Sequence, residues 1–427
     1  MIRMLHFGLG GIARSLTLPS TLVAGVVLVA TPVFAQSQSA GTPGEWLTRY
    51  TSARTLGMGG AYVAQADDPL GVLWNPAGLS GMEQNEVRFE HARLFEETSM
   101  NSIGFAVPGS RLPSLGVMVL SMRSGEFQRT NDMNDDLGTF RDSETAYLLT
   151  ASRALTPRLA IGANFKVVTH AVEDFSASGF GVDLGGTFDA TPSLRIGASL
   201  VNVGGPKHTL REVDEAYPLV IRGGFAATLF EGRGLIAAQV DQSSGPGVRV
   251  HAGGEYWIQP ALAVRAGYDQ SAPAGGFSYR FHPQYQFDYG VSDQTLGLTH
   301  RVGLSYRFGG FFASSSAEPE VFSPTGEKAV TRFTLNSRTK AEPREWTLDI
   351  LGKSGEVARR FGGKGQPPSH IQWDGKDESG MPLPDGQYRY RLVVIDSVGR
   401  VVESPDRMVE IATGGPQGTV PVLPVNP

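Results

Sequence analysis

The 427-residue sequence contains no cysteine. This absence excludes disulfide frameworks, thiolate metal sites and cysteine nucleophiles, and it suits an exported protein that folds without oxidation. Apolar residues are also limited, at 41% of the chain. After residue 35 no run reaches the roughly 18 apolar residues of a membrane-spanning helix, so the sequence predicts no transmembrane helix in the mature protein.

Positive charge is in the minority, with 37 Lys and Arg against 42 Asp and Glu and a net charge of −5. Arg3 and Arg14 flank the start of the chain, an apolar run follows at residues 21–30, and Val33-Phe34-Ala35 is a small-residue cleavage site. We therefore expect residues 1–35 to be an export signal peptide. Its removal takes away two positive charges and leaves −7. This balance gives no indication of a nucleic-acid partner.

Between residues 86 and 308 the chain repeats segments of roughly ten residues with two unlike faces, separated by turn residues. In one of them Ile161 and Phe165 share an apolar side, whereas Asn164 and Lys166 lie on the other. Such alternation predicts strands with one apolar and one polar face, as a half-buried sheet or a transmembrane barrel requires. The expected strands begin near residues 86, 98, 112, 143, 158, 178, 193, 217, 234, 247, 261, 275, 285 and 298.

These fourteen strands form an even number, which puts both ends of the sheet on the periplasmic side of a barrel. The connections are expected to be short, the longest being 125–142 and 204–216. Glycine is frequent, with 54 residues. Pairs such as 185–186, 223–224 and 253–254 fall inside the strands, as expected where a closed sheet must bend.

Residues 46–81 do not alternate. They contain Leu56-Gly57-Met58-Gly59-Gly60-Ala61-Tyr62-Val63-Ala64, then Asp67-Asp68-Pro69, then Trp74-Asn75-Pro76-Ala77-Gly78-Leu79. Asp68 before Pro69 predicts a helix start, and Asn75-Pro76 predicts a turn. The glycines allow tight bends, but no G-K-[ST] follows, so this is no phosphate loop.

This combination resembles the N-terminus of the FadL superfamily of outer-membrane barrels, and it is most similar to the PorV/PorQ branch. The resemblance covers about residues 53–308. It implies a fourteen-stranded barrel at residues 86–309, with an N-terminal plug segment at 36–85. The last strand, Arg301-Val302-Gly303-Leu304-Ser305-Tyr306-Arg307-Phe308, resembles the signal for outer-membrane assembly.

The composition changes after Phe308. Residues 310–320 are expected to be a linker, 321–412 a small soluble β-sandwich and 413–427 a disordered tail. The sandwich resembles the immunoglobulin-like domain of FlgD through Phe322-Ser323-Pro324, Trp373-Asp374-Gly375 and Asp385-Gly386-Gln387-Tyr388. The family's acidic loop is replaced by Thr325-Gly326-Glu327-Lys328, so no calcium site is expected.

Two sets of residues are candidate sites. The first is the plug motif, to which the resemblance gives a part in gating and for which a structural turn is the alternative: Gly57, Gly59, Gly60, Asn75, Pro76 and Ala77. The second is a set of lumen-facing charges, which would line a polar conduit or pack the lumen as ion pairs: Lys166, Asp183, Arg249, Glu255, Arg265, Arg280 and Asp288.

No Ser-His-Asp or paired-carboxylate spacing supports an enzyme, although an outer-membrane protease or phospholipase could use such a scaffold. No catalytic residue, cofactor or metal is expected. The sequence thus predicts an all-β protein of the outer membrane of a diderm bacterium, with a periplasmic C-terminal domain. The expected partners are outer-membrane lipid, envelope or secreted proteins, and hydrophobic small molecules in the case of a channel.

Three functions remain open. The first is a PorV/PorQ-like, non-enzymatic component of protein secretion or cargo handover. The alternative is a FadL-like channel for hydrophobic compounds such as long-chain fatty acids, and the third is a structural anchor for an envelope protein. Short loops and a charged lumen favour secretion, because a lipid channel needs long outer loops and an apolar binding site.

Overall fold

The computed structural model describes residues 43–48, 52–110, 112–210, 213–244, 247–270, 272–294, 297–326, 329–352 and 354–414. The expected signal peptide lies outside the described residues, as does all but the start of the expected C-terminal tail. Within the described ranges, no helix is long and apolar enough to cross a membrane.

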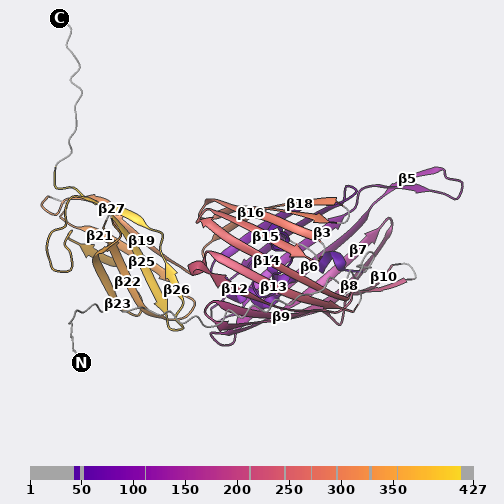
Figure 1. The fold of residues 1–427 in the computed structure, drawn as a ribbon, viewed down its shortest axis with the longest axis horizontal. Coiled ribbons are helices and arrows are strands. Elements are labelled where there is room, and N and C mark those ends of the chain that lie inside the picture. The colour runs from indigo at the N-terminus through magenta and orange to yellow at the C-terminus, as the bar shows by residue number, and fades with distance from the viewer. Residues whose placement is uncertain are drawn as a thin grey trace, which may run out of the picture. The chain divides into compact units, whose positions relative to one another are not determined.

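Fourteen antiparallel strands form a closed transmembrane β-barrel, in which β1 pairs with β18 to complete the ring (Figure 1). Each strand pairs with its neighbours in the barrel. The strands are β1 (Asn85–Arg93), β2 (Ser99–Val107), β3 (Ser114–Arg123), β6 (Asp142–Ala154), β7 (Leu159–Val172), β8 (Phe175–Thr191), β9 (Leu194–Val203), β12 (Val220–Leu229), β13 (Gly234–Ser243), β14 (Gly247–Gln259), β15 (Leu262–Asp269), β16 (Ala272–His282), β17 (Tyr285–Gln294) and β18 (Gly297–Phe308). The predicted fold class and strand number are confirmed.

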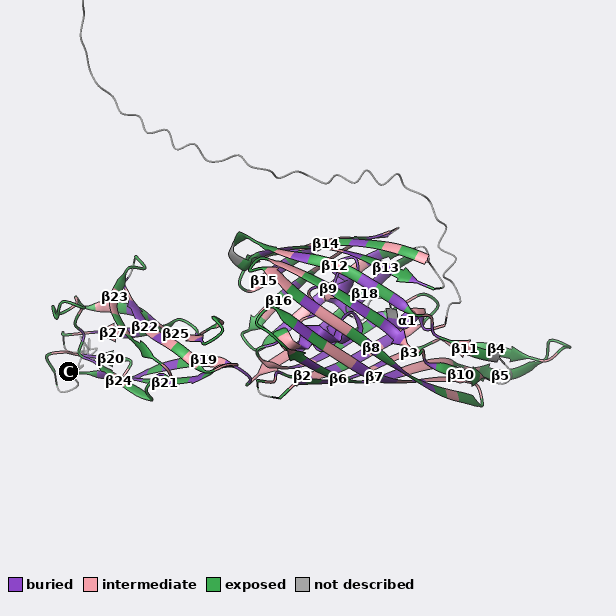
Figure 2. Ribbon diagram, turned by 90° about the horizontal axis from the view of Figure 1, so that it is seen from below, coloured by how far each residue is buried: buried purple, intermediate pink, exposed green. Residues whose placement is uncertain are grey.

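The alternation of apolar and polar residues in the sequence corresponds to the outer and lumen-facing sides of the barrel strands. On β7, Phe165 is 50% exposed on the outside, whereas Lys166 is fully buried in the lumen. Figure 2 shows these exposed and buried positions alternating along the barrel strands. Apolar side chains therefore cover the exterior and the polar positions face inward, as a barrel in lipid requires.

The two ends of the barrel differ. The connection between β3 and β6 contains the hairpin β4 (Phe127–Thr130) and β5 (Asp136–Phe140), and that between β9 and β12 contains β10 (Lys207–Leu210) and β11 (Val213–Ala216). These two stretches are the ones that the sequence predicts as the longest connections. We call the end that carries both hairpins the hairpin end. The opposite end, where β1 begins and β18 ends, is the short-turn end; one of its turns is η3 (Phe230–Gly232).

The N-terminal segment contains α1 (Glu45–Thr48), α2 (Ala53–Gly57), η1 (Gly71–Leu73) and η2 (Pro76–Gly81). Ser52 caps α2 by accepting a hydrogen bond from the Thr55 N–H, and the Thr55 hydroxyl oxygen accepts one from the Ser52 N–H. The expected helix start at Asp68 is a tight turn, in which the Asp68 carboxylate accepts the N–H groups of Leu70 and Gly71 at 2.9 and 2.8 Å.

After the barrel, residues 312–411 form two sheets. One contains β19 (Phe312–Glu318), β21 (Thr331–Arg338) and β24 (His370–Trp373). The other contains β20 (Val321–Phe322), β22 (Pro343–Leu351), β23 (Val357–Lys364), β25 (Gly386–Asp396), β26 (Val401–Glu403) and β27 (Arg407–Ile411). Phe333, Trp373 and Tyr390 pack in the core that the two sheets share. The expected linker at 310–320 is not purely a linker, because β19 lies in it and pairs with β21.

Candidate functional site

The lumen contains the N-terminal segment, which we call the plug (residues 45–82). Nearly all of its described residues from Ser52 to Leu79 are buried. Helix α2 contacts β15, β16, β17 and β18, whereas η2 contacts β3, β6, β7 and β8. The plug therefore crosses the lumen from one wall to the opposite wall.

Glycines bring the plug backbone against the wall. Gly59 and Gly60 have φ angles of +60° and +82°, which only glycine adopts easily. Opposite them, a Cβ added to Gly267 would lie 2.2 Å from the Gly59 nitrogen, and one added to Gly253 would lie 2.3 Å from the Met58 carbonyl oxygen. These wall glycines thus make room for the main chain of the plug, whereas the sequence suggested bending of the sheet as the reason for Gly253.

The plug motif meets the wall at Asn75, which is fully buried. Its side-chain oxygen accepts the Ala77 N–H at 3.0 Å and so caps η2, which begins at Pro76. Its amide nitrogen donates to the carbonyl of Val63 at 2.8 Å and to that of Gly186 on β8 at 3.0 Å. One side chain therefore ties together two turns of the plug and a barrel strand, and this geometry supports the structural alternative.

One side of the lumen is charged. Arg54 of α2 holds Glu255 of β14 through two hydrogen bonds of 2.9 and 3.0 Å, and Arg265 of β15 binds the same carboxylate at 2.6 Å. Arg265 also lies 3.4 Å from Asp288 of β17. Because all four groups are at least largely buried, each charge depends on its partners.

The network continues to Arg88 of β1, which is fully buried and pairs with Glu90 at 3.0 Å and with Asp288. Glu90 in turn accepts the N–H of Ala53 at 2.9 Å, so the wall holds the start of α2. We had not singled out Glu86, Arg88 and Glu90, although they alternate with Val87 and Phe89 in the sequence and could have been found by the same pattern.

The other predicted charges also lie on the lumen side. Lys166 and Asp183 form a fully buried pair at 2.6 Å between β7 and β8, and Arg249 pairs with Glu45 of α1 at 2.5 Å. Arg280 differs. Its guanidinium lies 3.9 Å from the centre of the Trp257 ring and donates to Gln286 at 2.9 Å, and no carboxylate of the described residues is within ion-pair distance.

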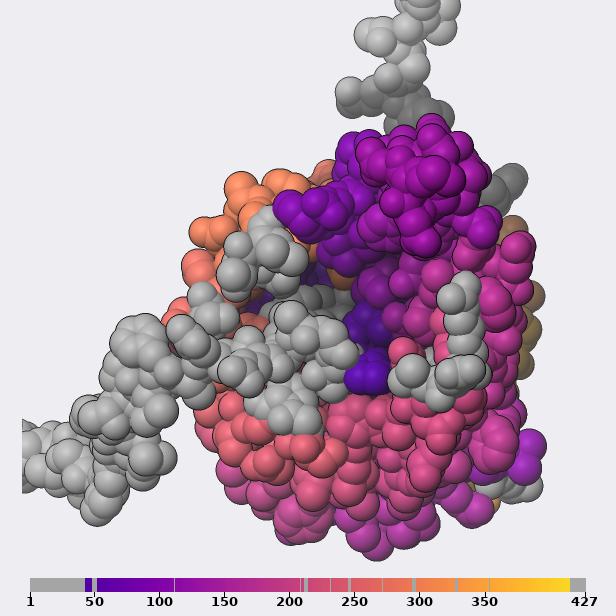
Figure 3. All heavy atoms as spheres, turned by 90° about the vertical axis from the view of Figure 1, so that its right-hand side faces the viewer, coloured from indigo at the N-terminus to yellow at the C-terminus, as the bar shows by residue number. Residues whose placement is uncertain are grey.

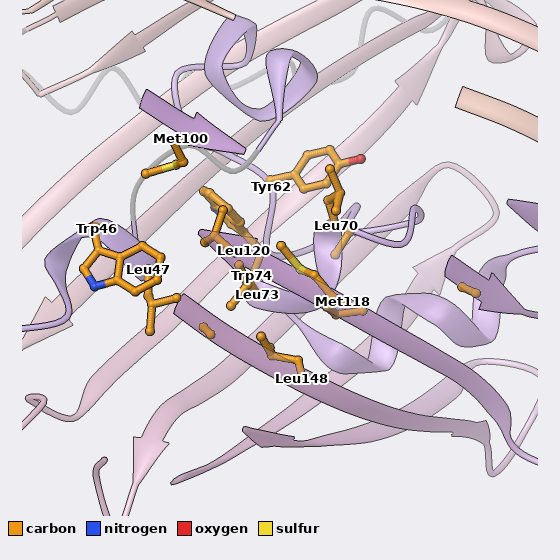
Figure 4. Packing of buried hydrophobic residues seen from close by; sticks show 14 of the residues in the cluster. Trp46, Leu47, Tyr62, Leu70, Leu73, Trp74, Met100, Met118, Leu120 and Leu148 are labelled. Atoms are coloured by element: carbon orange, nitrogen blue, oxygen red, sulfur yellow. The ribbon is translucent and has the colours of Figure 1, made fainter. Parts of the chain in front are cut away.

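The opposite side of the lumen also contains an apolar cluster, which we did not predict from the sequence and which lies beside the Lys166–Asp183 pair. Trp46, Leu47, Leu73 and Trp74 of the plug pack there against inward-facing wall residues (Figure 4). The wall residues of this apolar side belong to β1, β2, β3, β6 and β7, and they are Ala92, Met100, Ala106, Met118, Leu120, Ala146, Leu148 and Val168. Met100 pairs with Ala92 close to the hairpin end, so the cluster reaches the outer part of the lumen.

A signal for this apolar side was present in the sequence. Strand β3 contains Leu115-Gly116-Val117-Met118-Val119-Leu120, which is apolar on both faces. Such a continuous run is typical of a strand that is buried on both sides, here by lipid outside and by the plug inside. The alternation of charged residues elsewhere drew attention away from it.

Each end of the lumen has an opening of its own. At the short-turn end a polar cavity of about 530 Å³ is lined by Arg54, Glu255, Arg280 and Arg307, among others. Figure 3 looks at the hairpin end and shows a hollow with N-terminal residues at its floor. No cluster of His, Asp or Glu with metal-binding geometry occurs among the described residues.

Fold and site together define a transmembrane β-barrel whose lumen is filled by its own N-terminal segment and holds both buried ion pairs and an apolar cluster. No family model matches the chain, and no curated protein matches it. Among solved structures it is similar to CymD, a monoaromatic hydrocarbon channel, at 16% identity and a TM-score of 0.48, covering 60% of this chain and 97% of that one.

Two other similar structures are the toluene transporter TodX of Pseudomonas putida and a FadL homologue of Pseudomonas aeruginosa. The first has 14% identity and a TM-score of 0.47, with 60% of this chain and 97% of that one covered. The second has 11% identity and a TM-score of 0.43, with 61% and 98% covered. The closed barrel itself rests on the strand pairing described above.

Proposed function

We propose that this protein is an outer-membrane channel for small hydrophobic compounds and that its N-terminal plug gates it. The apolar side of the lumen is the observation that carries the proposal. Ligand sites for hydrophobic molecules are concave, largely apolar and lined by aromatic and flexible side chains. Trp46 and Trp74 of the plug pack against Met100 and Met118 of the wall, and movement of the plug would leave these side chains as the lining of such a site.

The exterior supports the placement in the outer membrane. Large apolar side chains such as Phe89, Ile103, Phe165 and Leu304 are about half exposed on the outer face. Barrels of the outer membrane have short periplasmic turns and longer external connections, so the hairpin end faces outward. The first strand begins and the last strand ends at the short-turn end, and the domain that follows would therefore be periplasmic.

The sequence favoured a secretion component of the PorV/PorQ kind because of short loops and a charged lumen. Both reasons are weaker in the structure. The two longest connections form hairpins at one end, and the lumen contains an apolar cluster as well as its charged pairs. The channel, which was the alternative, fits this arrangement better.

The channel can be tested by uptake into liposomes that contain the purified protein, with toluene and a long-chain fatty acid as probes. The test variant is Met118→Gln, which places an amide in the apolar side, and Met118→Leu is the matched control. We expect Gln to lower uptake by about tenfold, since burying an unpaired amide costs on the order of 1–2 kcal/mol, and Leu to leave it unchanged. No uptake by the wild type, or equal uptake by both variants, would contradict the proposal.

A second candidate function is favoured by the two-sheet domain after the barrel. It has a core of its own, built around Phe333, Trp373 and Tyr390, and offers a folded surface to an envelope or secreted protein. Pull-downs from envelope extract with and without residues 321–412 test this. A protein captured only by the full chain, together with absent uptake of both probes, would favour secretion or anchoring over the channel.

A further inference from the structure

The outer face of the barrel carries a line of basic side chains at the hairpin end. In the strand register, Arg93 of β1 lies between His300 of β18 and Ser99 of β2, and Ser99 lies beside Arg123 of β3. Residues that are directly paired across adjacent strands point to the same face of the sheet; we say that such residues lie at one level. That face is the exterior, because Phe89 of β1 is 47% exposed while Glu90 is 1% exposed. We call Arg93, Arg123 and His300 the cation row.

The cation row is unusual in lacking acids. All three side chains are exposed, and no carboxylate of the described residues lies within 4.0 Å of them. Two other exposed arginines at the same end do have partners: Arg129 pairs with Glu173, and Arg141 with Glu126. Arg93 and Arg123 are therefore free to receive an anion from outside the chain, and His300 beside them is hydrogen-bonded to the Tyr289 hydroxyl at 2.8 Å.

The surface becomes apolar directly below the cation row. Two residues nearer the short-turn end, on the same face of β1 and β2, lie His91 and Asn101, which are hydrogen-bonded at 2.8 Å. The next level contains Phe89, Ile103 and Leu304, which are 47%, 49% and 47% exposed. The change from cations to exposed apolar side chains thus takes place within three levels of the sheet. Such a border occurs where the headgroups of a membrane leaflet meet its hydrocarbon core.

An aromatic ladder marks the opposite border. Its rings stack across β16, β17, β18 and β2 at centroid distances of 5.8, 4.8, 5.1 and 6.3 Å, and they belong to Phe281, Tyr285, Tyr306, Phe308 and Phe105. Phe308 is level with Asn85, eight residues from Arg93 along β1. Eight residues span about 26 Å of strand, or about 20 Å along the normal at a tilt of ~40°. The ladder and the cation row are therefore separated by about 20 Å, somewhat less than the roughly 25 Å apolar band of an outer-membrane barrel.

We propose that the cation row binds the phosphate groups of an acylated, phosphorylated glycolipid in the outer leaflet. The acyl chains of this lipid lie on Phe89, Ile103 and Leu304. Arginine suits the role, since its planar guanidinium binds phosphate oxygens in pairs. Arg93 and Arg123 are two strands apart, about 10 Å, so they can hold two phosphates of one headgroup. The inference rests on the proposed outer-membrane placement with the hairpin end outward.

Native mass spectrometry of the full chain released from nanodiscs tests this proposal. The nanodiscs contain phosphatidylcholine with either bisphosphorylated lipid A or the same acylated disaccharide without phosphates. The test variant is Arg93→Gln/Arg123→Gln. The matched control is Arg153→Gln/Arg158→Gln, which removes two exposed arginines near the short-turn end. Heat-modifiable migration on a gel confirms that each variant retains a folded barrel.

We expect the wild type and the control to retain bisphosphorylated lipid A and not its phosphate-free form. The double variant should bind it about thirtyfold more weakly, since each arginine near an anionic surface contributes roughly a fivefold gain. Equal retention by the double variant, equal retention of the phosphate-free lipid, or displacement by excess inorganic phosphate would overturn the proposal. Liposome uptake of toluene is measured separately, so a failed channel function leaves lipid retention as an independent result.

Discussion

Removal of the Asn75 side chain should loosen the plug without opening the barrel. Asn75→Ala deletes the three hydrogen bonds to Ala77, Val63 and Gly186, all of them inside the lumen. Each such bond contributes on the order of 1 kcal/mol net, so the free energy of plug opening should fall by about 3 kcal/mol. This corresponds to roughly a hundredfold larger population of the open plug. The barrel's own strand pairing contains none of these bonds and should persist.

Hydrogen–deuterium exchange of the protein in micelles measures this effect. Peptides within residues 60–80 should exchange roughly a hundredfold faster in Asn75→Ala, while peptides from β14–β17 keep their protection. Asn101→Ala is the matched control, because this asparagine lies on the outside and bonds only His91 among the described residues. Unchanged exchange in the plug of Asn75→Ala would refute the role that we assign to this side chain.

Asn75→Asp distinguishes the capping of η2 by the side-chain oxygen from the hydrogen bonds that the amide nitrogen donates to the carbonyls of Val63 and Gly186. The substitution keeps an oxygen that can accept the Ala77 N–H, but it faces the carbonyls of Val63 and Gly186 with a second acceptor in place of a donor. If capping alone mattered, Asp would behave like the wild type. We expect faster plug exchange than in the wild type, because the two carbonyls lose their donor and a charge is buried.

Three further predictions concern other parts of the chain. Gly267→Ala should lower the thermal midpoint of unfolding by several degrees, because its Cβ would lie 2.2 Å from the Gly59 nitrogen. The control Gly223→Ala has open space around it and should leave the midpoint unchanged. Equal midpoints for the two variants would be evidence against close plug packing. Lys166→Met leaves Asp183 as an uncompensated buried charge, so the free energy of unfolding in urea should fall by about 3–5 kcal/mol. A decrease of less than about 1 kcal/mol would show that water or another group replaces the lysine. In the two-sheet domain, hydrogen bonds from the backbone N–H and hydroxyl of Thr413 lower the pKa of the Asp385 carboxyl. This contact should therefore hold at neutral pH and weaken as the pH falls through that lowered pKa. The Thr413 amide should then lose its protection from hydrogen exchange in acid, and constant protection would argue against the bond.

The barrel could be predicted from the sequence because one physical cause, lipid outside and polar groups inside, acts on every strand. Each expected strand start lies within three residues of the observed one. The hairpins β4–β5 and β10–β11 were missed because they lie outside the lipid and the lumen. Their side chains are mostly exposed where described, so no alternation distinguishes them from loops.

The site was harder to predict, because its contacts join residues far apart in the chain. Lys166 and Asp183 could be assigned to the lumen from local pattern, but that they pair with each other depends on the register of β7 and β8. The apolar side was missed for a related reason. Met118 and Leu148 resemble lipid-facing residues in composition, and only the position of Trp74 and Leu73 shows that they face inward.

The wall glycines have a consequence for how this protein can vary. Gly253, Gly267 and Gly290 face carbonyl and amide groups of the plug rather than its side chains. A surface shaped to accept main chain does not depend on which side chains that main chain bears, provided that they are small where they meet the wall. Change is thus restricted at these three barrel positions, where any side chain would occupy the space of the plug, and at Gly59 and Gly60, whose φ angles only glycine adopts easily. Barrel and plug together determine how closely their main chains approach.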